Sequence, residues 1–394
     1  MKIFSRFSIF HLSSNFLTLY VLHYLNDGFD ASFILLLPFI AKELHLSLTQ
    51  VGFVGTLSNS LSVILALPAG YIATKIGGIK TLVLALFVYG LAYIGTGFSP
   101  NYFWILLVFI LGGVGFGVFH TIGFALIARW SIKEERGKQM GNFTAIGDTG
   151  KISLTAVLTF IIILIGWRYT SMLYGIVAII AAVFISFIIF SRKEHFVTKA
   201  QQTKEINFVE ILKHTKFLFA TITGFFDCLA SSSLFMFLPF LLLKRGVSPA
   251  FLGSFAATFF IGNFIGKLVL GRFTDKYGTS KVFITAEILM GLFIFLFANT
   301  SSFLLIIIFS IILGIFTKGT VAVTNTMVSE ASEHHGNFEK AFGVNEFITS
   351  IGTTIAPLIL GLLSDKFGIV SAFYAMGIAA IIAAIPAYFF YKTK

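Results

Sequence analysis

Stretches of about 20 apolar residues recur along the whole chain between short polar segments, and this repetition constrains the fold more than any other feature. A helix needs roughly 20 apolar residues to cross a bilayer core of about 30 Å. The 394 residues are 57% hydrophobic and 11% charged, a balance that a surface facing water would not tolerate. The sequence therefore predicts an all-α integral membrane protein with twelve transmembrane helices. The predicted spans are residues 17–41, 50–73, 80–98, 102–128, 140–165, 169–190, 216–243, 250–273, 281–298, 302–328, 341–363 and 369–391.

The net charge of +11 is explained by where the basic residues lie. If the N-terminus lies inside, 20 of the 28 Lys and Arg residues fall in the tails and inner loops, and five fall in outer loops. Cytoplasmic loops of membrane proteins carry such an excess, so we expect both termini in the cytoplasm of a bacterial inner membrane. Nucleic acid, the usual partner of a basic soluble protein, is not expected.

Catalytic and metal-binding signatures are missing from the sequence. The single cysteine, Cys228, excludes a disulfide framework and a Cys-rich metal site. There is no HExxH, no Gly-x-Ser-x-Gly and no pairing of Cys and His at metal spacing. We therefore expect no enzyme activity, no metal and no cofactor.

The chain divides near its middle into two related halves. A polar stretch rich in Lys, Glu, Gln and Thr predicts a cytoplasmic linker over 191–215, between a six-helix half at 1–190 and another at 216–394. Sequence patterns recur between the halves at offsets of 200 to 202, which indicates duplication. Because six spans separate the copies, the halves are predicted to be parallel repeats about an axis along the membrane normal.

The clearest repeat lies in the loop after the second span of each half. Gly70-Tyr-Ile-Ala-Thr-Lys75-Ile-Gly77-Gly-Ile-Lys80 recurs as Gly271-Arg-Phe-Thr-Asp275-Lys276-Tyr-Gly278-Thr-Ser-Lys281. This pattern resembles the signature of the major facilitator superfamily, although Thr74 stands where the first copy should have an acid. The resemblance implies a conformational latch at these residues; simple anchoring by positive charge is the alternative. Arg129, at a cytoplasmic span end, is a further candidate gate or anchor.

Three further segments resemble a narrower group, the exporters of the fosmidomycin-resistance type. They are His23-Tyr-Leu-Asn26-Asp27, Phe119-His120 and Gly147-Asp148-Thr-Gly150. This resemblance implies export of a drug-like compound and favours a role for His120 in binding substrate or protons.

Charged residues inside spans cost roughly 2.5 to 3.5 kcal/mol each on insertion scales, so they usually face a cavity or a partner. His23, Asp27 and Asp30 are spaced four and three residues apart and should share one helix face, where they could relay a proton. Asp27 is the leading candidate proton carrier, and structural pairing is the alternative. Asp148 and Lys151, three residues apart, are interpreted as a structural pair.

A second set of polar residues inside spans is proposed to contact substrate. Lys267 and Lys318 could receive a carboxylate, because neither has a basic counterpart in the first half. Alternatively, acids of the same half, including Glu287, neutralise these lysines. The predicted substrate contacts are His120, Lys267, Lys318, Asp227, Asn26 and Glu346.

Together these features predict a monomeric secondary transporter that moves a small organic solute by alternating access, coupled to protons, with efflux of a drug-like compound or metabolite favoured. Proton-coupled uptake or exchange of an organic anion, such as a carboxylate or siderophore, is the alternative within transport. A membrane solute sensor without transport is the alternative of a different class.

Overall fold

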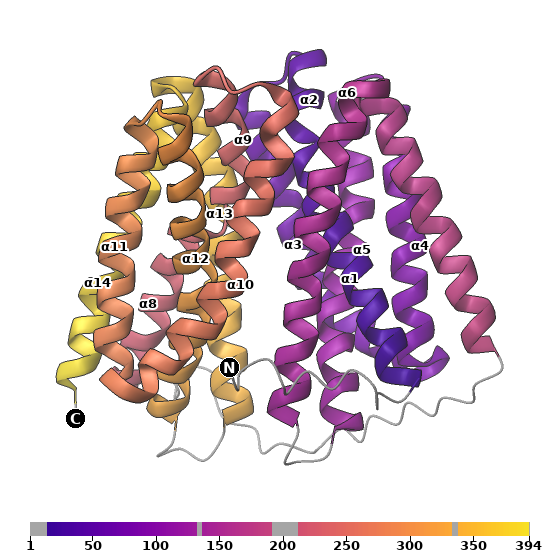
Figure 1. Ribbon diagram of the computed structural model, residues 1–394. Coiled ribbons are helices and arrows are strands. Elements are labelled where there is room, and N and C mark those ends of the chain that lie inside the picture. Colours follow the sequence, from indigo (N-terminus) through magenta and orange to yellow (C-terminus); the bar gives the residue numbers. More distant parts are fainter. Residues whose placement is uncertain (1–13, 132–135, 191–211, 333–337, 394) are drawn as a thin grey trace, which may run out of the picture.

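The computed structural model describes residues 14–131, 136–190, 212–332 and 338–393, and these residues form helices and no strands. Most of the predicted linker at 191–215 lies outside the described residues. Two helical bundles stand side by side in Figure 1, one in indigo to magenta and one in orange to yellow. The first bundle contains α1 (Ser14–Leu35), α2 (Leu37–Glu43), α3 (Leu48–Ile76), α4 (Gly78–Gly97), α5 (Tyr102–Trp130) and α6 (Arg136–Phe190).

The second bundle repeats this plan with one short additional turn. It contains α8 (Thr215–Ser231), α9 (Leu234–Lys244), the 3-10 turn η3 (Pro249–Phe251), α10 (Leu252–Tyr277), α11 (Thr279–Asn299), α12 (Phe303–Ser332), α13 (Phe338–Phe367) and α14 (Ile369–Lys392). The first predicted span of each half is divided into two helices, α1 with α2 and α8 with α9. The start of α1 and the end of α14 lie at the same end of the molecule (Figure 1).

The predicted span count is confirmed once α6 is divided. This helix has 55 residues, and at 1.5 Å per residue its length of about 80 Å exceeds two bilayer cores. Its backbone is helical except at Gly166, where φ is 77° and the chain turns back. α6 therefore supplies two spans, and the described helices supply twelve in total.

The two bundles meet along two helix pairs. α3 packs against α13, and α6 packs against α10. With an offset of about 200 residues, α3 corresponds to α10 and α13 corresponds to the first part of α6. One helix pair is therefore the counterpart of the other, as two parallel repeats related by an axis along the membrane normal require.

The repeated loop motif forms the same turn in both halves. Gly77 joins α3 to α4 with φ of 96°, and Gly278 joins α10 to α11 with φ of 87°. Only glycine adopts such values without strain, which explains the final glycine of the motif. Both turns lie at the end of the molecule where α1 starts and α14 ends. Lys75, Lys80 and Lys276 lie beside these turns, so we call this end of the molecule the basic end.

Candidate functional site

The site begins where α1 and α6 approach closely. A Cβ atom on Gly150 would lie 2.0 Å from the backbone oxygen of Tyr24, and one on Gly28 would lie 2.7 Å from the oxygen of Gly150. Both positions therefore require glycine, because any side chain would separate the helices. This approach brings Asp27 of α1 beside Lys151 of α6.

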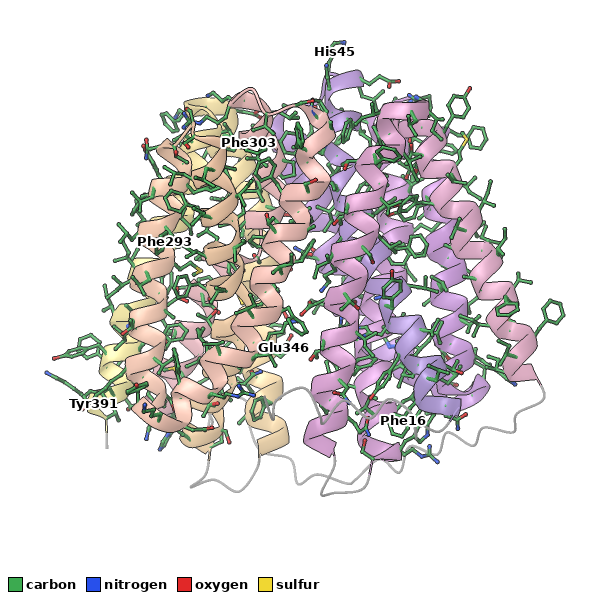
Figure 2. The ribbon with its side chains drawn as sticks, viewed as in Figure 1. Phe16, His45, Phe293, Phe303, Glu346 and Tyr391 are labelled. Atoms are coloured by element: carbon green, nitrogen blue, oxygen red, sulfur yellow. The ribbon has the colours of Figure 1, made fainter. Side chains whose placement is uncertain are left out.

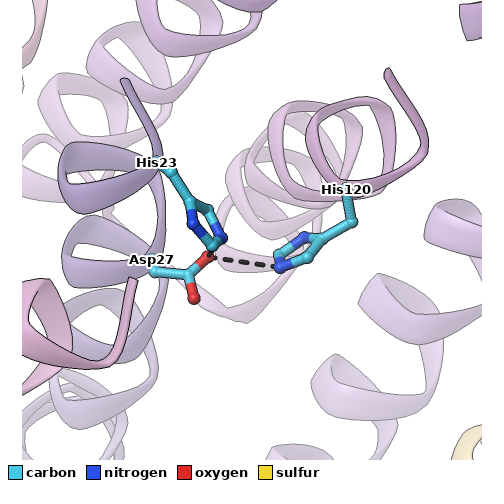
Figure 3. Close-up of side chains that lie close together, drawn as sticks. All are labelled: His23, Asp27 and His120. Carbon is cyan, nitrogen blue, oxygen red and sulfur yellow. Dashed lines mark ion pairs between the residues drawn. The ribbon is translucent and has the colours of Figure 1, made fainter. Parts of the chain in front are cut away.

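Asp27 is 2% exposed and lies at the centre of a cluster of four ionisable side chains. One carboxylate oxygen, Oδ1, lies 3.3 Å from Nε2 of His23 and 3.3 Å from Nε2 of His120. Figure 3 shows both imidazole rings directed at this carboxylate, one from α1 and one from α5. The other oxygen, Oδ2, lies 2.8 Å from Nζ of Lys151, so each oxygen of Asp27 faces nitrogen. Asn26 donates from Nδ2 to Oδ1 of Asp27 at 3.3 Å.

A line of alternating charges continues from this cluster into the second bundle. Lys151 lies 3.6 Å from Asp148, one turn away on α6. Asp148, which is 1% exposed, lies 2.6 Å from Nζ of Lys267 on α10. The interpretation of Asp148 and Lys151 as a pair is therefore incomplete, because each has its shorter contact with a residue of another helix. The four side chains Asp27, Lys151, Asp148 and Lys267 link α1, α6 and α10 by ionic contacts.

A metal ion is a possible occupant of the cluster by spacing alone. The ligand atoms of His23, Asp27 and His120 lie within 4.8 Å of one another. However, the ammonium group of Lys151 lies against the same carboxylate and would repel a cation. We therefore do not interpret the cluster as a metal site.

The remaining predicted site residues form no described ion pair with the cluster. Asp30 accepts a hydrogen bond of 2.6 Å from the hydroxyl of Tyr89 on α4, a partner that sequence reasoning missed because nothing distinguishes Tyr89 among the aromatic residues. Asp227 accepts a hydrogen bond of 3.0 Å from Thr320. Lys318 is exposed and forms no ion pair with a described residue, so acids of its own half do not neutralise it by direct contact.

Two other expectations concerned charged side chains of the second half. Glu346 is exposed, and Figure 2 shows it on α13 near the boundary between the two bundles. Glu287, the candidate counter-ion of the alternative interpretation, is fully buried, and its carboxylate contacts no described lysine in this conformation.

The motif residues at the basic end make contacts mainly with aromatic rings. Lys75 lies 4.5 Å from the ring centroid of Tyr71, Lys276 lies 5.0 Å from that of Tyr277, and Lys281 lies 6.0 Å from that of Tyr391. Asp275 is exposed and forms no ion pair with a described residue, so an acid-base latch at the basic end is not engaged in this conformation. Gly70 and Gly271 lie within α3 and α10, and Arg129 is exposed in the last turn of α5.

At the opposite end, the two bundles are joined by a contact that sequence reasoning missed. The carboxylate of Asp365 accepts hydrogen bonds of 2.8 Å from the backbone N–H groups of both Leu48 and Thr49, the first residues of α3. A carboxylate from the second half thus caps a helix N-terminus of the first half. The sequence contained a signal for this contact. Gly361-Leu-Leu-Ser-Asp365-Lys-Phe-Gly368 has the same spacing of its two glycines and its Asp-Lys pair as the loop motif. Gly368 also has φ of 87°.

Further contacts of α3 with α13 continue from this cap toward the membrane centre. Thr56 donates to the backbone oxygen of Thr354 at 2.7 Å, and Asn59 donates to that of Thr353 at 3.0 Å. All of these contacts involve the first half of α3 and the second half of α13. Among the described residues, the bundles are therefore hydrogen-bonded along these helices only on the side away from the basic end.

Replacement of Asp365 by Ala is expected to weaken this closure. The change removes two charge-assisted hydrogen bonds, each worth about 1.5 to 3 kcal/mol when buried and less at this exposed position. Site-directed labelling of a cysteine at Leu46 should therefore become several-fold faster than in the parent protein. Lys366→Ala, one residue away, is the matched control and should leave the rate unchanged. Equal rates in all three proteins would contradict the proposed role of the cap.

Comparison with known proteins shows that the chain is similar in sequence and fold to membrane transporters. A family model described as Major Facilitator Superfamily matches residues 16–226 and 220–394. The multi-drug resistance efflux pump PmrA of Streptococcus pneumoniae is 25% identical over 351 residues, covering 86% of each chain. A D-galactonate transporter of Escherichia coli is 21% identical over 383 residues, covering 88% of this chain and 87% of that protein.

A solved structure of similar fold is a bacterial homologue of the human lysosomal transporter Spinster, in an inward-facing and occupied conformation. Its TM-score is 0.76 at 16% identity, and the alignment covers 96% of this chain and 97% of that chain.

Proposed function

We propose that this chain, which belongs to the major facilitator superfamily, is a proton-coupled transporter that moves a small organic anion across a bacterial inner membrane. Transport is the activity of its relatives, and none of those named above is an enzyme. The observation that carries the proposal is the line of charges from Asp27 through Lys151 and Asp148 to Lys267, with two histidines at its first member. Ionisable groups inside a membrane are costly even when paired, and where they occur they typically mark pathways for solutes or protons.

The position of this line suggests how it acts. Lys267 lies in the second bundle and Asp148 lies in the first. Movement of one half against the other therefore changes the distance between these two side chains and can break their contact. If the basic end is cytoplasmic, the closure at the opposite end corresponds to a conformation that faces the cytoplasm. Binding of a proton or solute at the line can then bias which end is open, provided that it binds one conformation better than the other.

The charges favour an anionic solute. Lys267 retains 30% exposure of its side chain although it contacts Asp148, and Lys318 is exposed in the same half. A carboxylate could replace that of Asp148 on Lys267, since the two groups have the same chemistry. A proton added to the cluster contributes positive charge and should strengthen binding of an anion, which is the linkage expected of symport.

Efflux of a drug-like compound is the second candidate. It is favoured by the similarity to PmrA, which covers most of both chains, and by the resemblance of the three short segments to exporters. An exported cation would compete with the proton at Asp27, whereas a symported anion would bind together with it.

Proteoliposomes with an acidic exterior test the proposal directly. With D-galactonate as the carboxylate probe, we expect accumulation that a protonophore abolishes. Extrusion of ethidium in exchange for protons, without movement of D-galactonate, would support the second candidate instead. If a pH gradient drives neither probe, proton coupling is rejected.

Lys267→Ala is expected to reduce uptake of D-galactonate by at least about tenfold, the cost of one charge-assisted hydrogen bond. Asp148 keeps Lys151 as a neighbour at 3.6 Å, so the variant should fold. Lys42→Ala, an exposed lysine of α2 away from the line of charges, is the control and should transport normally. Unchanged uptake by Lys267→Ala would remove Lys267 from the substrate site.

A further inference from the structure

One hydrogen bond and one ion-pair contact restrict the protonation state of His23. Nδ1 of its ring lies 2.7 Å from the backbone carbonyl oxygen of Phe143 on α6. A carbonyl oxygen only accepts, so Nδ1 must carry a hydrogen in this contact. The opposite nitrogen, Nε2, lies at an ion-pair distance of 3.3 Å from Oδ1 of Asp27 and forms no hydrogen bond with a described residue.

Neither neutral form of His23 satisfies both contacts. With hydrogen on Nδ1 alone, the bare Nε2 would direct its lone pair at a carboxylate oxygen. With hydrogen on Nε2 alone, Nδ1 would face the oxygen of Phe143 at 2.7 Å as one acceptor against another. Only the imidazolium form donates a hydrogen bond to Phe143 and at the same time presents a positive charge to the carboxylate of Asp27.

The surroundings of the ring also favour a positive charge. His23 is 1% exposed and lies between two aromatic rings, with Phe143 stacked at 3.7 Å and Phe119 stacked at 5.6 Å between ring centroids. Aromatic faces attract a cation more strongly when water is excluded. Gly147 of α6 makes room for the ring, because a Cβ atom there would lie 2.6 Å from Cε1 of His23.

The ionisable groups near His23 come from all three packed helices. α1 contributes Asp27, α5 contributes His120, and α6 contributes Lys151 with Asp148 behind it. Lys151 repels a charge on His23, but it is held by Oδ2 of Asp27 while His23 faces Oδ1. The carboxylate therefore stands between the two cations and can stabilise both.

We propose that His23, rather than Asp27, holds the coupling proton, and that His120 is the group through which this proton enters and leaves. The inference rests on the proposed proton coupling and assigns it to a residue. The side chain of His120 is 32% exposed, whereas those of Asp27 and His23 are 3% and 2% exposed, so only His120 is accessible to water.

The proton moves without any other reactant. It leaves Nε2 of His23, is accepted by Oδ1 of Asp27, passes to Nε2 of His120 and then to water. Both histidine nitrogens face the same oxygen at 3.3 Å, so one carboxylate oxygen serves both transfers. His23 is left neutral, with its hydrogen on Nδ1 and its bond to Phe143 intact.

Loss of the proton changes the charges along the line. Asp27 then no longer shares its charge with a positive His23, so it attracts Lys151 more strongly and draws it away from Asp148. Asp148 is left to Lys267, and the contact between the two halves strengthens. Protonation of His23 has the opposite effect and makes Lys267 more available to an anion.

Nitrogen-15 NMR of histidine-labelled protein in lipid nanodiscs tests the charge on His23 without any substrate. We expect both ring nitrogens of His23 to carry a proton at pH 7, with the signals of His45, which lies on the surface at the opposite end (Figure 2), as the reference. The His23 signals are identified by their loss in His23→Gln. A neutral His23 at pH 7 would overturn the proposal.

A transport assay is the second test of the proposal. His23→Gln should lose at least tenfold of its pH-driven accumulation of D-galactonate, and its exchange of D-galactonate across the membrane should lose its dependence on pH, because the group that carries the proton is removed. His45→Asn is the control and should keep both activities. Retained accumulation in His23→Gln would overturn the assignment while leaving proton coupling intact. Absence of accumulation in the parent protein would instead reject the proposed function, and the NMR result would still decide the charge on His23.

Discussion

Asp27→Asn is expected to abolish pH-driven accumulation, with a loss of at least about 100-fold, because it removes the negative charge that three nitrogen-bearing side chains share. It should also destabilise the protein. Lys151, with 17% side-chain exposure, loses its closest counter-ion, and breaking such a buried pair typically costs about 3 kcal/mol. Uptake of D-galactonate into proteoliposomes and the thermal midpoint in detergent measure the two effects.

A compensating variant distinguishes the effect of Asp27→Asn on proton coupling from its effect on the stability of the protein. Asp27→Asn combined with Lys151→Met removes both charges of the pair, so most of the lost thermal stability should return. Coupling should remain absent, since the shared carboxylate is still missing. If Asp27→Asn alone accumulates D-galactonate as the parent protein does, Asp27 takes no part in coupling.

Gly52→Val is expected to prevent closure of the end opposite the basic end. A Cβ atom at Gly52 would lie 2.1 Å from the backbone oxygen of Pro357 on α13, and backbone cannot move aside as a flexible side chain can. The bundles should separate at this end, and uptake should fall at least about tenfold because one half of the transport cycle is blocked. Spin labels at Lys42 and Lys366, in a background with Cys228→Ser, should report a longer distance between the bundles.

Gly141→Val is the matched control for this change. Gly141 is also a helical glycine, in α6, and a Cβ atom there meets nothing within 4 Å. Gly141→Val changes the helix propensity in the same way as Gly52→Val but causes no clash between the bundles. The distance between the two spin labels should therefore match that of the parent protein. A Gly52→Val protein with an unchanged distance would show that the α3 to α13 contact does not define the closed end.

The spans were predictable because their signal is local. Twelve apolar stretches of bilayer length define twelve spans, and even the break within α6 falls between the predicted spans 140–165 and 169–190. Contacts within one helix were predictable for the same reason. His23 and Asp27, four residues apart, meet as the helical period requires.

Contacts between helices were harder to foresee. Asp30 shares a helix face with Asp27 in sequence terms, yet its hydrogen-bond donor is Tyr89 of α4. The alternative for Lys267 was a counter-ion within its own half, but it contacts Asp148 of the other half. Such partners depend on how closely particular helices approach, and no periodicity within one helix contains that information.

The sequence by itself determined the membrane class, the twelve spans, the duplicated halves and the list of ionisable groups that must find partners in the membrane, because composition and helical period specify these locally. Tertiary structure alone decided which groups meet. The glycines of α1 and α6 allow Asp27 to reach Lys151, and the packing of α6 against α10 joins Asp148 to Lys267. The physical reason is that a charge in a low-dielectric interior is stabilised only by groups within a few ångströms, and those distances are set by packing between helices.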